Sequence, residues 1–285
     1  MCKLAIIGGS GLYSMPGLED IEERAITTPF GDPSGPIIVG KLEGQPIAFL
    51  ARHGVGHYLS PTEINYPANI FALKALGVER IVGISACGSL REDYVPGDIV
   101  IPDQLFDFTK NRKRTFFDGG LVAHISIPDP FCADLSDKVY QAVELTDSDV
   151  HQGGTFITIE GPRFSTRAES NTFRAWGMSI IGMTTSPEAF LAREAEICYA
   201  TLAHVTDYDV WHITEEPVTV EMVIEILNQN TTVAQQAVEN LVGQLDPERS
   251  CDCQNAMATA MITNPDVIPA VTRGRLNLLI DKYLD

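Results

Sequence analysis

The sequence predicts an α/β fold in which helices flank a central, mixed and twisted β-sheet. Short apolar, β-branched segments recur along the chain, and Gly, Pro or charged residues bound them, as is typical of buried strands. Helical patterns lie between several of these segments, and such alternation is typical of α/β folds. Apolar residues make up 45% of the chain, which is enough for a substantial core. We find no internal repeat or low-complexity linker, so we expect a single domain over residues 1–285.

The predicted strands share an apolar, β-branched character and a length of about four to eight residues. They are residues 3–7, 46–51, 80–85, 98–102, 155–159, 179–183 and 198–205. Because helical patterns separate several of them, we expect their pairing to be mostly parallel or mixed.

Four segments are predicted helices. Residues 66–76 place apolar side chains on one face. Ser186, Pro187 and Glu188 have the character of a cap, a first-turn proline and a first-turn acid for a helix over 189–196. Thr219 is a candidate cap for a long helix ending near residue 245, and residues 271–283 form a final helix. Residues 246–285 are therefore expected to be a helical tail, in which 246–266 is the least patterned segment.

Composition excludes several classes of protein. The net charge of −18 argues against nucleic-acid binding, which needs a basic surface. No uninterrupted apolar stretch reaches 18 residues, so we expect no membrane span. The N-terminal residues lack a charged-then-apolar leader, and the six cysteines are ordinary for this length. We therefore expect a cytoplasmic protein with buried, reduced thiols.

The glycine-rich segment "IIGGSGLYSMPG" at residues 6–17 suggests a phosphate-binding loop. It fails as a dinucleotide fingerprint, because the third glycine is missing and Met15-Pro16-Gly17 would stop the required helix. Two interpretations stay open. The segment is a tight turn after the first strand, or the Ser10 hydroxyl and nearby backbone N–H groups bind a free oxyanion.

An acidic protein that binds an anion needs a few well-placed cations. Arg52 and His53 directly follow an apolar segment, and His57 comes four residues later. Arginine matches phosphate oxygens with a planar fork, and ligand sites of α/β sheets lie at the carboxyl ends of strands. The alternative is an arginine paired with a carboxylate and a surface histidine.

Small and hydroxyl-bearing residues follow two further predicted strands. Ser85 and Ala86 offer a hydroxyl and a backbone N–H, and Thr184 offers another hydroxyl. Close packing of loops is the alternative interpretation. Together with Ser10 and Arg52, these groups supply the hydrogen-bond donors and the positive charge that a binding site for inorganic phosphate needs. We find no acid and histidine cluster at ligand spacing, so we expect neither a metal nor a cofactor.

Two carboxylates, Asp207 and Asp209, follow the most apolar segment of the C-terminal half. A carboxylate just past a buried strand destabilises the fold unless it is hydrogen-bonded. Apolar surroundings also raise the pKa of such a group. Such a group can share a proton with a ring nitrogen. A pair of turn or capping aspartates is the alternative.

With these motifs, the chain resembles the 5'-methylthioadenosine phosphorylases of the purine nucleoside phosphorylase superfamily. The resemblance covers about residues 3–245, and its motifs occur in the family's order. They are "IIGGSGL", "ARHG", "PTEINYPANIFALK", "SACGSLRED…PGDIVIPDQ", "IEGPRFSTRAES", "MTTSPEAFLAREA" and "TDYDVW".

The resemblance implies a nucleoside phosphorylase-like fold and cleavage of 5'-methylthioadenosine by inorganic phosphate, a co-substrate, to adenine and 5-methylthioribose 1-phosphate. This is a pentosyltransferase reaction of purine and methionine salvage. It also implies a homotrimer or a dimer of trimers.

The resemblance assigns a role to each of the following residues. Phosphate contacts are Ser10, Arg52, His53, Ser85, Ala86 and Thr184, with serine at positions 10 and 85 where threonine is usual. Asp207 faces purine N7 as the catalytic acid, and Asp209 lies on the 6-amino side. The other nucleoside contacts are Phe164, Met183, Val220, Val223 and, from a neighbouring subunit, His124.

Aspartates at 207 and 209 favour adenine over hypoxanthine, because a carboxylate accepts from a 6-amino group. Apolar Val220 and Val223 favour a methylthio group, although such a pocket discriminates by only roughly 1–3 kcal/mol per methylene-sized group. The alternatives are a phosphorylase for inosine or methylthioinosine, a dinucleotide oxidoreductase and a non-catalytic nucleoside-binding protein.

Cys251 and Cys253 form a C-x-C pair in the tail. A disulfide between them would be strained and easily reduced, whereas two free surface thiols fit a reducing cytosol. Zinc would need a second pair of ligands, and the sequence does not indicate one.

Overall fold

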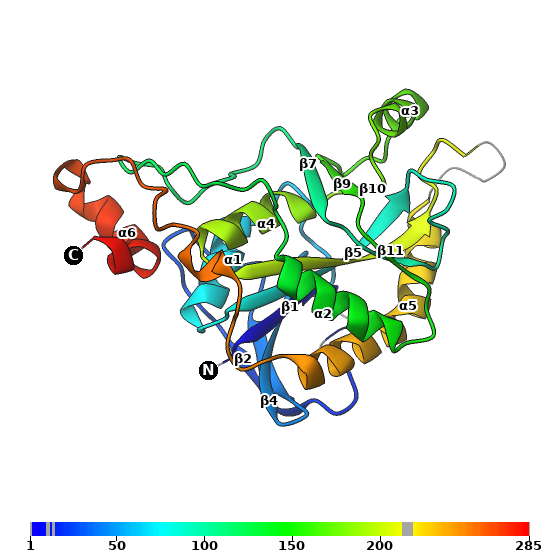
Figure 1. Cartoon of the computed structure of the whole chain (residues 1–285), viewed down its shortest axis with the longest axis horizontal. Coiled ribbons are helices and arrows are strands. Elements are labelled where there is room, and N and C mark those ends of the chain that lie inside the picture. Colours follow the sequence, from blue (N-terminus) through cyan, green and yellow to red (C-terminus); the bar gives the residue numbers. More distant parts are fainter. Residues whose placement is uncertain (1, 10–11, 13–14, 213–218, 285) are drawn as a thin grey trace.

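A computed structural model describes residues 2–9, 12, 15–212 and 219–284, without the side chains of 222–230. Its strands join one mixed sheet of eleven strands, with helices on both faces (Figure 1). The strands are β1 (Leu4–Gly8), β2 (Glu19–Arg24), β3 (Ile37–Leu42), β4 (Gln45–Ala51), β5 (Arg80–Ser89), β6 (Ile99–Ile101), β7 (Gln104–Phe108), β8 (Val150–Gln152), β9 (Thr155–Ile159), β10 (Ile180–Gly182) and β11 (Cys198–Asp207).

The sheet branches at its central strand, β5. The main order is β2-β3-β4-β1-β5-β10-β9-β7, and β11, β6 and β8 extend from β5 as a second branch. β5 runs parallel to β1 and β11 and antiparallel to β10. Its ten residues are mostly buried and apolar, as expected for a strand covered on both faces.

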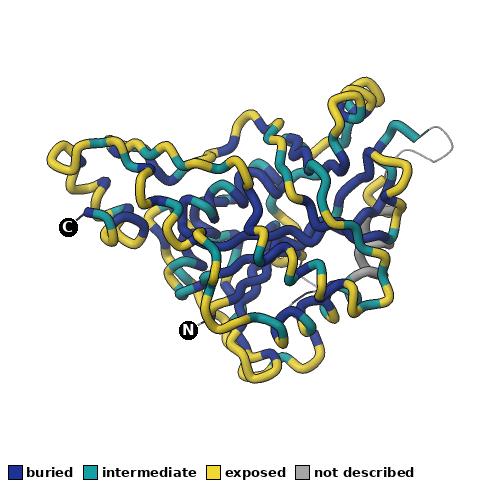
Figure 2. Tube along the Cα trace, in the orientation of Figure 1, coloured by how far each residue is buried: buried dark blue, intermediate teal, exposed yellow. Residues whose placement is uncertain are grey.

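Helices α1 (Tyr66–Ala75) and α4 (Thr185–Glu194) lie over one face of the sheet, and α2 (Ala133–Glu144) and α5 (Val220–Gln244) over the other. β1 shows why both faces are apolar. Ala5 and Ile7 join the core beneath α1 and α4, whereas Leu4 and Ile6 join the core beneath α2 and α5. Side chains alternate along a strand, so this continuous apolar segment supplies both cores. Figure 2 shows the buried strands between these layers.

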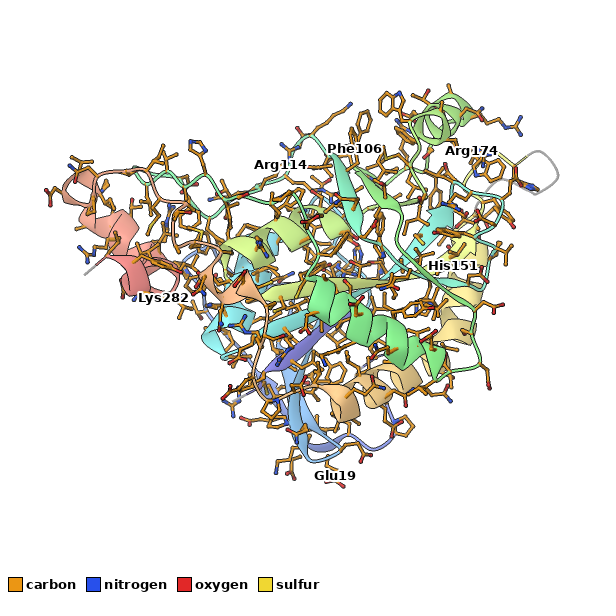
Figure 3. The ribbon with its side chains drawn as sticks, in the orientation of Figure 1. Glu19, Phe106, Arg114, His151, Arg174 and Lys282 are labelled. Carbon is orange, nitrogen blue, oxygen red and sulfur yellow. The ribbon has the colours of Figure 1, made fainter. Side chains whose placement is uncertain are left out.

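The last part of the C-terminal tail, which contains α6, and residues 117–125 form an arm that projects from the body of the molecule (Figures 1 and 2). Ala123 pairs with Met261, and the His124 N–H donates to the Ala260 carbonyl at 2.8 Å. The tail contains the short 3₁₀ turns Asp252–Asn255, Pro265–Val267 and Asp281–Tyr283 and the helix α6 (Ala270–Ile280). Lys282, labelled in Figure 3, pairs with Glu196 at 3.2 Å and holds the tail against the body.

The predicted strands and helices are confirmed, with changes at their ends. β5 continues to Ser89 and β11 to Asp207, beyond the predicted ends at 85 and 205. The last helix ends at Ile280 and continues as a 3₁₀ turn. Ser186 has the extended backbone of a cap (φ −96°, ψ 134°), but its hydroxyl has no hydrogen-bond partner within the described part of the chain.

Several elements were missed from the sequence: β2, β3, β7, β8, α2 and α3 (Arg167–Ala175). The signal for α3 was present. Thr166 accepts from the Glu169 N–H at 3.2 Å and Glu169 accepts from the Thr166 N–H at 2.8 Å, which makes a capping box. No helix among the described residues has the length and apolar character that crossing a membrane requires.

Candidate active site

The parallel strands β4, β1 and β5 bring Arg52, the end of β1 and Ser85 close together in the sheet. Gly8 lies opposite Ala51, so the chain after β1 and Arg52 after β4 are neighbours. Ser85 lies opposite Ala203 on β11, which ends at Asp207. β1 and β4 end at this level of the sheet, whereas β5 and β11 continue past it to Ser89 and Asp207. Ser10 lies outside the described residues.

Arg52 is buried, with only 3% of its surface exposed. Its guanidinium makes a two-pronged ion pair with Glu188 on α4, through Nε to Oε2 at 2.9 Å and Nη2 to Oε1 at 2.8 Å. Nη1 donates to the Ile84 carbonyl at 2.9 Å, and Nη2 also lies 3.3 Å from the Ile7 carbonyl oxygen. One side chain, which directly follows β4, thus joins β1 and β5 to α4.

The structure therefore contains the arginine–carboxylate pair that was the alternative for Arg52. Burial alone would lower the pKa of Arg52, but the Glu188 carboxylate outweighs it and the pKa is raised. Tyr199 also donates to Glu188 at 2.7 Å. Glu188, predicted from the sequence only as a first-turn acid of the helix, is the counterion of a buried arginine.

His53 is half-buried rather than a surface histidine. Its Nδ1 lies 2.9 Å from the Leu59 carbonyl oxygen, and its ring stacks on His57 with centroids 4.1 Å apart. Burial lowers the pKa of His53 to about 4, so the ring is neutral at pH 7. A carbonyl oxygen can only accept, so Nδ1 carries the proton and Nε2 is left as an acceptor.

Ser85 and Thr184, which are 99 positions apart in the sequence, lie with their hydroxyl oxygens 3.4 Å apart. Both are buried, Ser85 on β5 and Thr184 directly before α4. Ala86 follows Ser85 on the strand and is half-buried. The predicted convergence of hydroxyl groups thus exists for this pair.

Asp207 ends β11 and is 7% exposed. Its Oδ2 accepts from the Thr206 hydroxyl and its Oδ1 from the Asp209 N–H, both at 2.7 Å. A Cβ at Gly88 would lie 2.8 Å from Oδ1, so the glycine leaves room for the carboxylate. Burial raises the pKa of Asp207 to about 6, even though both hydrogen bonds lower it.

Asp209 is buried in a left-handed backbone conformation, with φ at +50°. Burial raises its pKa, although the hydroxyls of Ser170 and Ser165 lower it. Among the described residues, its Oδ2 has no partner with good hydrogen-bond geometry. Two buried carboxyl groups with raised pKa values therefore lie at the end of β11.

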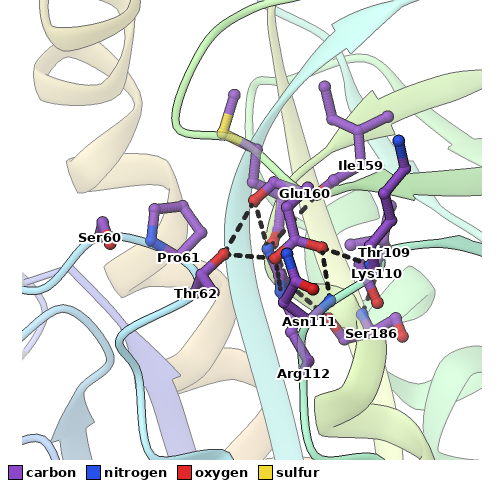
Figure 4. Close-up of polar contacts among 12 residues, drawn as sticks. Ser60, Pro61, Thr62, Thr109, Lys110, Asn111, Arg112, Ile159, Glu160 and Ser186 are labelled. Carbon is purple, nitrogen blue, oxygen red and sulfur yellow. Dashed lines mark hydrogen bonds and ion pairs between the residues drawn. The ribbon is translucent and has the colours of Figure 1, made fainter.

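Arg112 joins the loop that carries Met183 to Glu160, which lies four residues before Phe164. Figure 4 shows Arg112 and Glu160 with Thr62, Asn111 and Ser186 around them. The buried Arg112 donates through Nη1 to the Met183 carbonyl at 2.5 Å and through Nη2 to the Glu160 carbonyl at 2.7 Å. The Glu160 carboxylate accepts from Thr62 at 2.5 Å and from the Asn111 N–H at 3.2 Å. The sequence analysis missed this network, because its members are far apart in the chain.

A cavity of about 70 Å³ borders the loop that carries Phe164, and none of the residues predicted to contact phosphate or the nucleoside is among its lining residues. Its lining residues are Phe108, Lys110, Ile159, Glu160, Gly161, Arg163, Glu169 and Phe173.

For three predicted nucleoside contacts, the described residues show no contact with the rest of the candidate site. Val220 begins α5 and is 57% exposed. The side chain of Val223 lies outside the described residues. His124 is exposed on the arm, where its backbone pairs with Ala260.

Comparison with known proteins gives a consistent result. A sequence model of the Phosphorylase superfamily matches residues 3–243. An S-methyl-5'-thioadenosine phosphorylase of Geobacter sulfurreducens is 52% identical over 282 residues, covering 99% of each chain. One of Chloroflexus aurantiacus is 53% identical over 281 residues, covering 98% of each chain.

Solved structures of methylthioadenosine phosphorylases are also similar to this chain. A crystal structure of a methylthioadenosine phosphorylase from an antarctic soil metagenomic library matches with a TM-score of 0.93 and 47% identity, covering 98% of this chain and 99% of that one. The Schistosoma mansoni methylthioadenosine phosphorylase in complex with adenine matches with a TM-score of 0.83 and 34% identity, covering 99% of this chain and 98% of that one. The fold, the order of the motifs and these similarities agree that the chain belongs to the Phosphorylase superfamily and, within it, to the S-methyl-5'-thioadenosine phosphorylase family.

Proposed function

We propose that the protein cleaves the N-glycosidic bond of 5'-methylthioadenosine with inorganic phosphate, releasing adenine and 5-methylthioribose 1-phosphate. The observation that carries this proposal is the buried Asp207 carboxyl at the end of β11. Its pKa is raised to about 6, and its strand lies beside the one that carries Ser85. The names of the relatives support the same reaction.

At the phosphate end, Arg52, Ser85, Thr184, Ser10 and the Ala86 N–H would donate hydrogen bonds to the anion. Arg52 remains charged at every working pH. The neutral His53 would accept a hydrogen bond through Nε2 from the protonated oxygen of HPO₄²⁻, which suits the dianion. The bound dianion stabilises the positive charge that develops on the ribose and then attacks it.

At the base end, the departing purine gains negative charge. Asp207 would place a proton or hydrogen bond at N7 and relieve that charge, a contribution of roughly 100- to 10,000-fold in rate. Holding phosphate and nucleoside together contributes as much again or more, at roughly 7–11 kcal/mol in well-oriented cases.

The choice of base and sugar follows from the remaining residues. The free Oδ2 of Asp209 would accept from the 6-amino group of adenine. Met183 would lie under the ribose and Phe164 against the base, while Val220 and Val223 would line the methylthio pocket. We therefore expect adenine nucleosides to be preferred over 6-oxopurine nucleosides, with adenosine a poor substrate. No cofactor is proposed, and we expect the protein to work in the cytoplasm.

We also propose a homotrimer or a dimer of trimers, in which His124 completes a neighbouring site. Phe106, labelled in Figure 3, forms an exposed cluster with Phe108 and Trp176, whose side chains are 36–52% exposed. Exposed aromatic clusters favour association. Light scattering on the purified protein would give the mass of the assembly, and a monomer would contradict the proposal.

A phosphorolysis assay tests the function. Methylthioadenosine and inosine are each offered with and without phosphate, and base release is measured. We expect adenine release from methylthioadenosine that depends on phosphate. Release by water alone would identify a nucleosidase, and a preference for inosine would identify the 6-oxopurine alternative. Absence of turnover with retained nucleoside binding would identify a binding protein.

A further inference from the structure

Four cysteines from three separate parts of the chain meet at one point on the body of the molecule. The sulfur atoms of Cys132, Cys198, Cys251 and Cys253 all lie within 4.8 Å of one another. The C-x-C pair of the tail thus has the second pair of thiols that the sequence did not indicate. The second pair comes from the residue before α2 and from the first residue of β11.

Backbone hydrogen bonds and turns, rather than bonds between the sulfur atoms, position these cysteines. The Cys132 N–H donates to the Tyr199 carbonyl at 2.8 Å, and the Cys198 N–H donates to the Glu79 carbonyl at 3.0 Å. Cys251 directly precedes the 3₁₀ turn Asp252–Asn255, which contains Cys253. Cys132, Cys198 and Cys253 are at most 4% exposed, and Cys251 is half-buried.

We propose that these four cysteines bind a structural Zn²⁺ ion. Zinc prefers four thiolate ligands in a tetrahedron, with Zn–S distances of about 2.3 Å, which places the sulfurs about 3.8 Å apart. The Cys198 and Cys251 sulfurs are 3.3 Å apart, and the remaining separations stay within 4.8 Å. Small side-chain adjustments therefore suffice to close a tetrahedral site.

The surrounding charge fits a metal–thiolate centre. Four thiols lose four protons to solvent on binding Zn²⁺, which leaves a net charge of 2−. Two arginines face the sulfurs. Arg193 Nη1 donates to Cys253 Sγ at 3.3 Å, and Arg249 Nη1 lies 3.9 Å from Cys198 Sγ.

Arg193 is half-buried beside the cluster. Its Nε is buried without a hydrogen-bond partner, and no ion pair joins Arg193 to a carboxylate within the described residues. Two disulfides, however the four cysteines are paired, would be neutral and would leave this guanidinium without an anion. The anionic zinc centre is therefore the state that the charges favour.

The site would act on stability rather than on catalysis. Cys198 and Asp207 are at opposite ends of β11, so the metal and the catalytic carboxyl are separated by about 30 Å of strand at 3.3 Å per residue. The ion would fasten the tail to the body, since Cys251 and Cys253 belong to the tail and Cys132 and Cys198 do not. This inference does not depend on the proposed reaction.

Metal analysis of the purified full-length protein is the test. The protein is prepared without immobilised-metal chromatography or chelator, and zinc is measured by mass spectrometry. We expect about one zinc per chain. Cys251→Ser and Cys253→Ser are expected to retain less than about a tenth of it, whereas Cys2→Ser, at another buried cysteine, retains all of it.

Thiol counting keeps the test decisive even if a variant fails to fold. Wild-type protein is denatured with chelator and without reductant, and we expect all six cysteines to react. A chelator is also expected to lower the melting temperature of wild type by about 5 °C or more and to leave that of Cys251→Ser unchanged. Two reactive thiols, indicating two disulfides within the cluster, or a zinc content near zero would overturn the proposal.

Discussion

The two ends of the candidate active site handle charge in opposite ways. At the phosphate end, the buried Arg52 is neutralised by Glu188 and fixed by carbonyl groups of two strands. At the base end, Asp207 and Asp209 are equally buried, and burial raises the pKa of both. One end therefore holds an ion pair in a fixed position. The other end holds two carboxyl groups with raised pKa values, and the pKa of Asp207 is about 6.

This difference matches what the two parts of the reaction need. An anionic nucleophile is held best by donors that need no rearrangement. A leaving base needs a group that can give up a proton, which requires a pKa near the working pH. Changing each end in turn should therefore damage different measurable properties.

The largest effect is expected on turnover when Asp207, at the base end of the site, is substituted. Asp207→Asn should lower kcat for methylthioadenosine by at least roughly 100-fold, because an amide cannot supply the proton. Steady-state phosphorolysis measures it, with Asp137→Asn on the exposed surface of α2 as the control. A kcat within a few-fold of wild type would remove the assigned acid role.

Removing the Arg52–Glu188 ion pair at the phosphate end should instead reduce the stability of the fold. Glu188→Gln leaves the Arg52 charge buried without an anion, and we expect the free energy of unfolding to fall by about 3–5 kcal/mol. Denaturant titration measures it. Glu22→Gln, which disturbs the exposed pair with Arg24, serves as the control and should change stability by less than about 0.5 kcal/mol. A loss below about 1 kcal/mol for Glu188→Gln would show that the pair is not the structural centre of this end.

The protonation of Asp207 should appear in the pH dependence of stability. Its pKa is raised from 3.8 to about 6, so the protonated carboxyl favours the folded state below pH 3.8. That contribution, roughly 2–3 kcal/mol, is lost as the pH rises from about 4 through 6.

Wild type should therefore lose this stability over pH 4–6, whereas Asp207→Asn should not. The inactive variant is expected to gain stability relative to wild type at pH 8. Unfolding titrations at several pH values compare the two proteins. Parallel pH profiles would mean that the pKa of Asp207 is not raised.

A smaller effect is expected from one hydroxyl of the phosphate end. Ser85→Ala removes one donor to a charged oxygen, and we expect the phosphate KM to rise about tenfold with little change in kcat. The control is Ser136→Ala, a buried serine on α2. An unchanged phosphate KM would exclude Ser85 from the phosphate contacts.

The sequence predicted the parts of the fold whose signals are local. Apolar segments located β1, β4, β5 and β11, and the polar residues that follow them located the site edge. It did not predict β2 or α2, because exposed and amphipathic segments carry weaker patterns. α3 was missed for another reason, since its capping box at Thr166 and Glu169 was readable but was not used.

Partners that are distant in the chain could not be predicted. The pairing of Arg52 with Glu188 spans 136 positions, and Arg112 reaches Met183 across 71. The cysteine cluster shows the same limit, because only folding brings Cys132 and Cys198 to the C-x-C pair. Local patterns indicate which side chains a site needs, whereas tertiary packing decides which of them meet.

A crystal structure with bound phosphate or sulfate tests the central claim most directly. The account predicts one tetrahedral anion within hydrogen-bond distance of the Arg52 guanidinium and the hydroxyls of Ser85 and Thr184, with Asp207 across the site from it. Density for the anion elsewhere, or none among these groups at saturating concentration, would contradict the account.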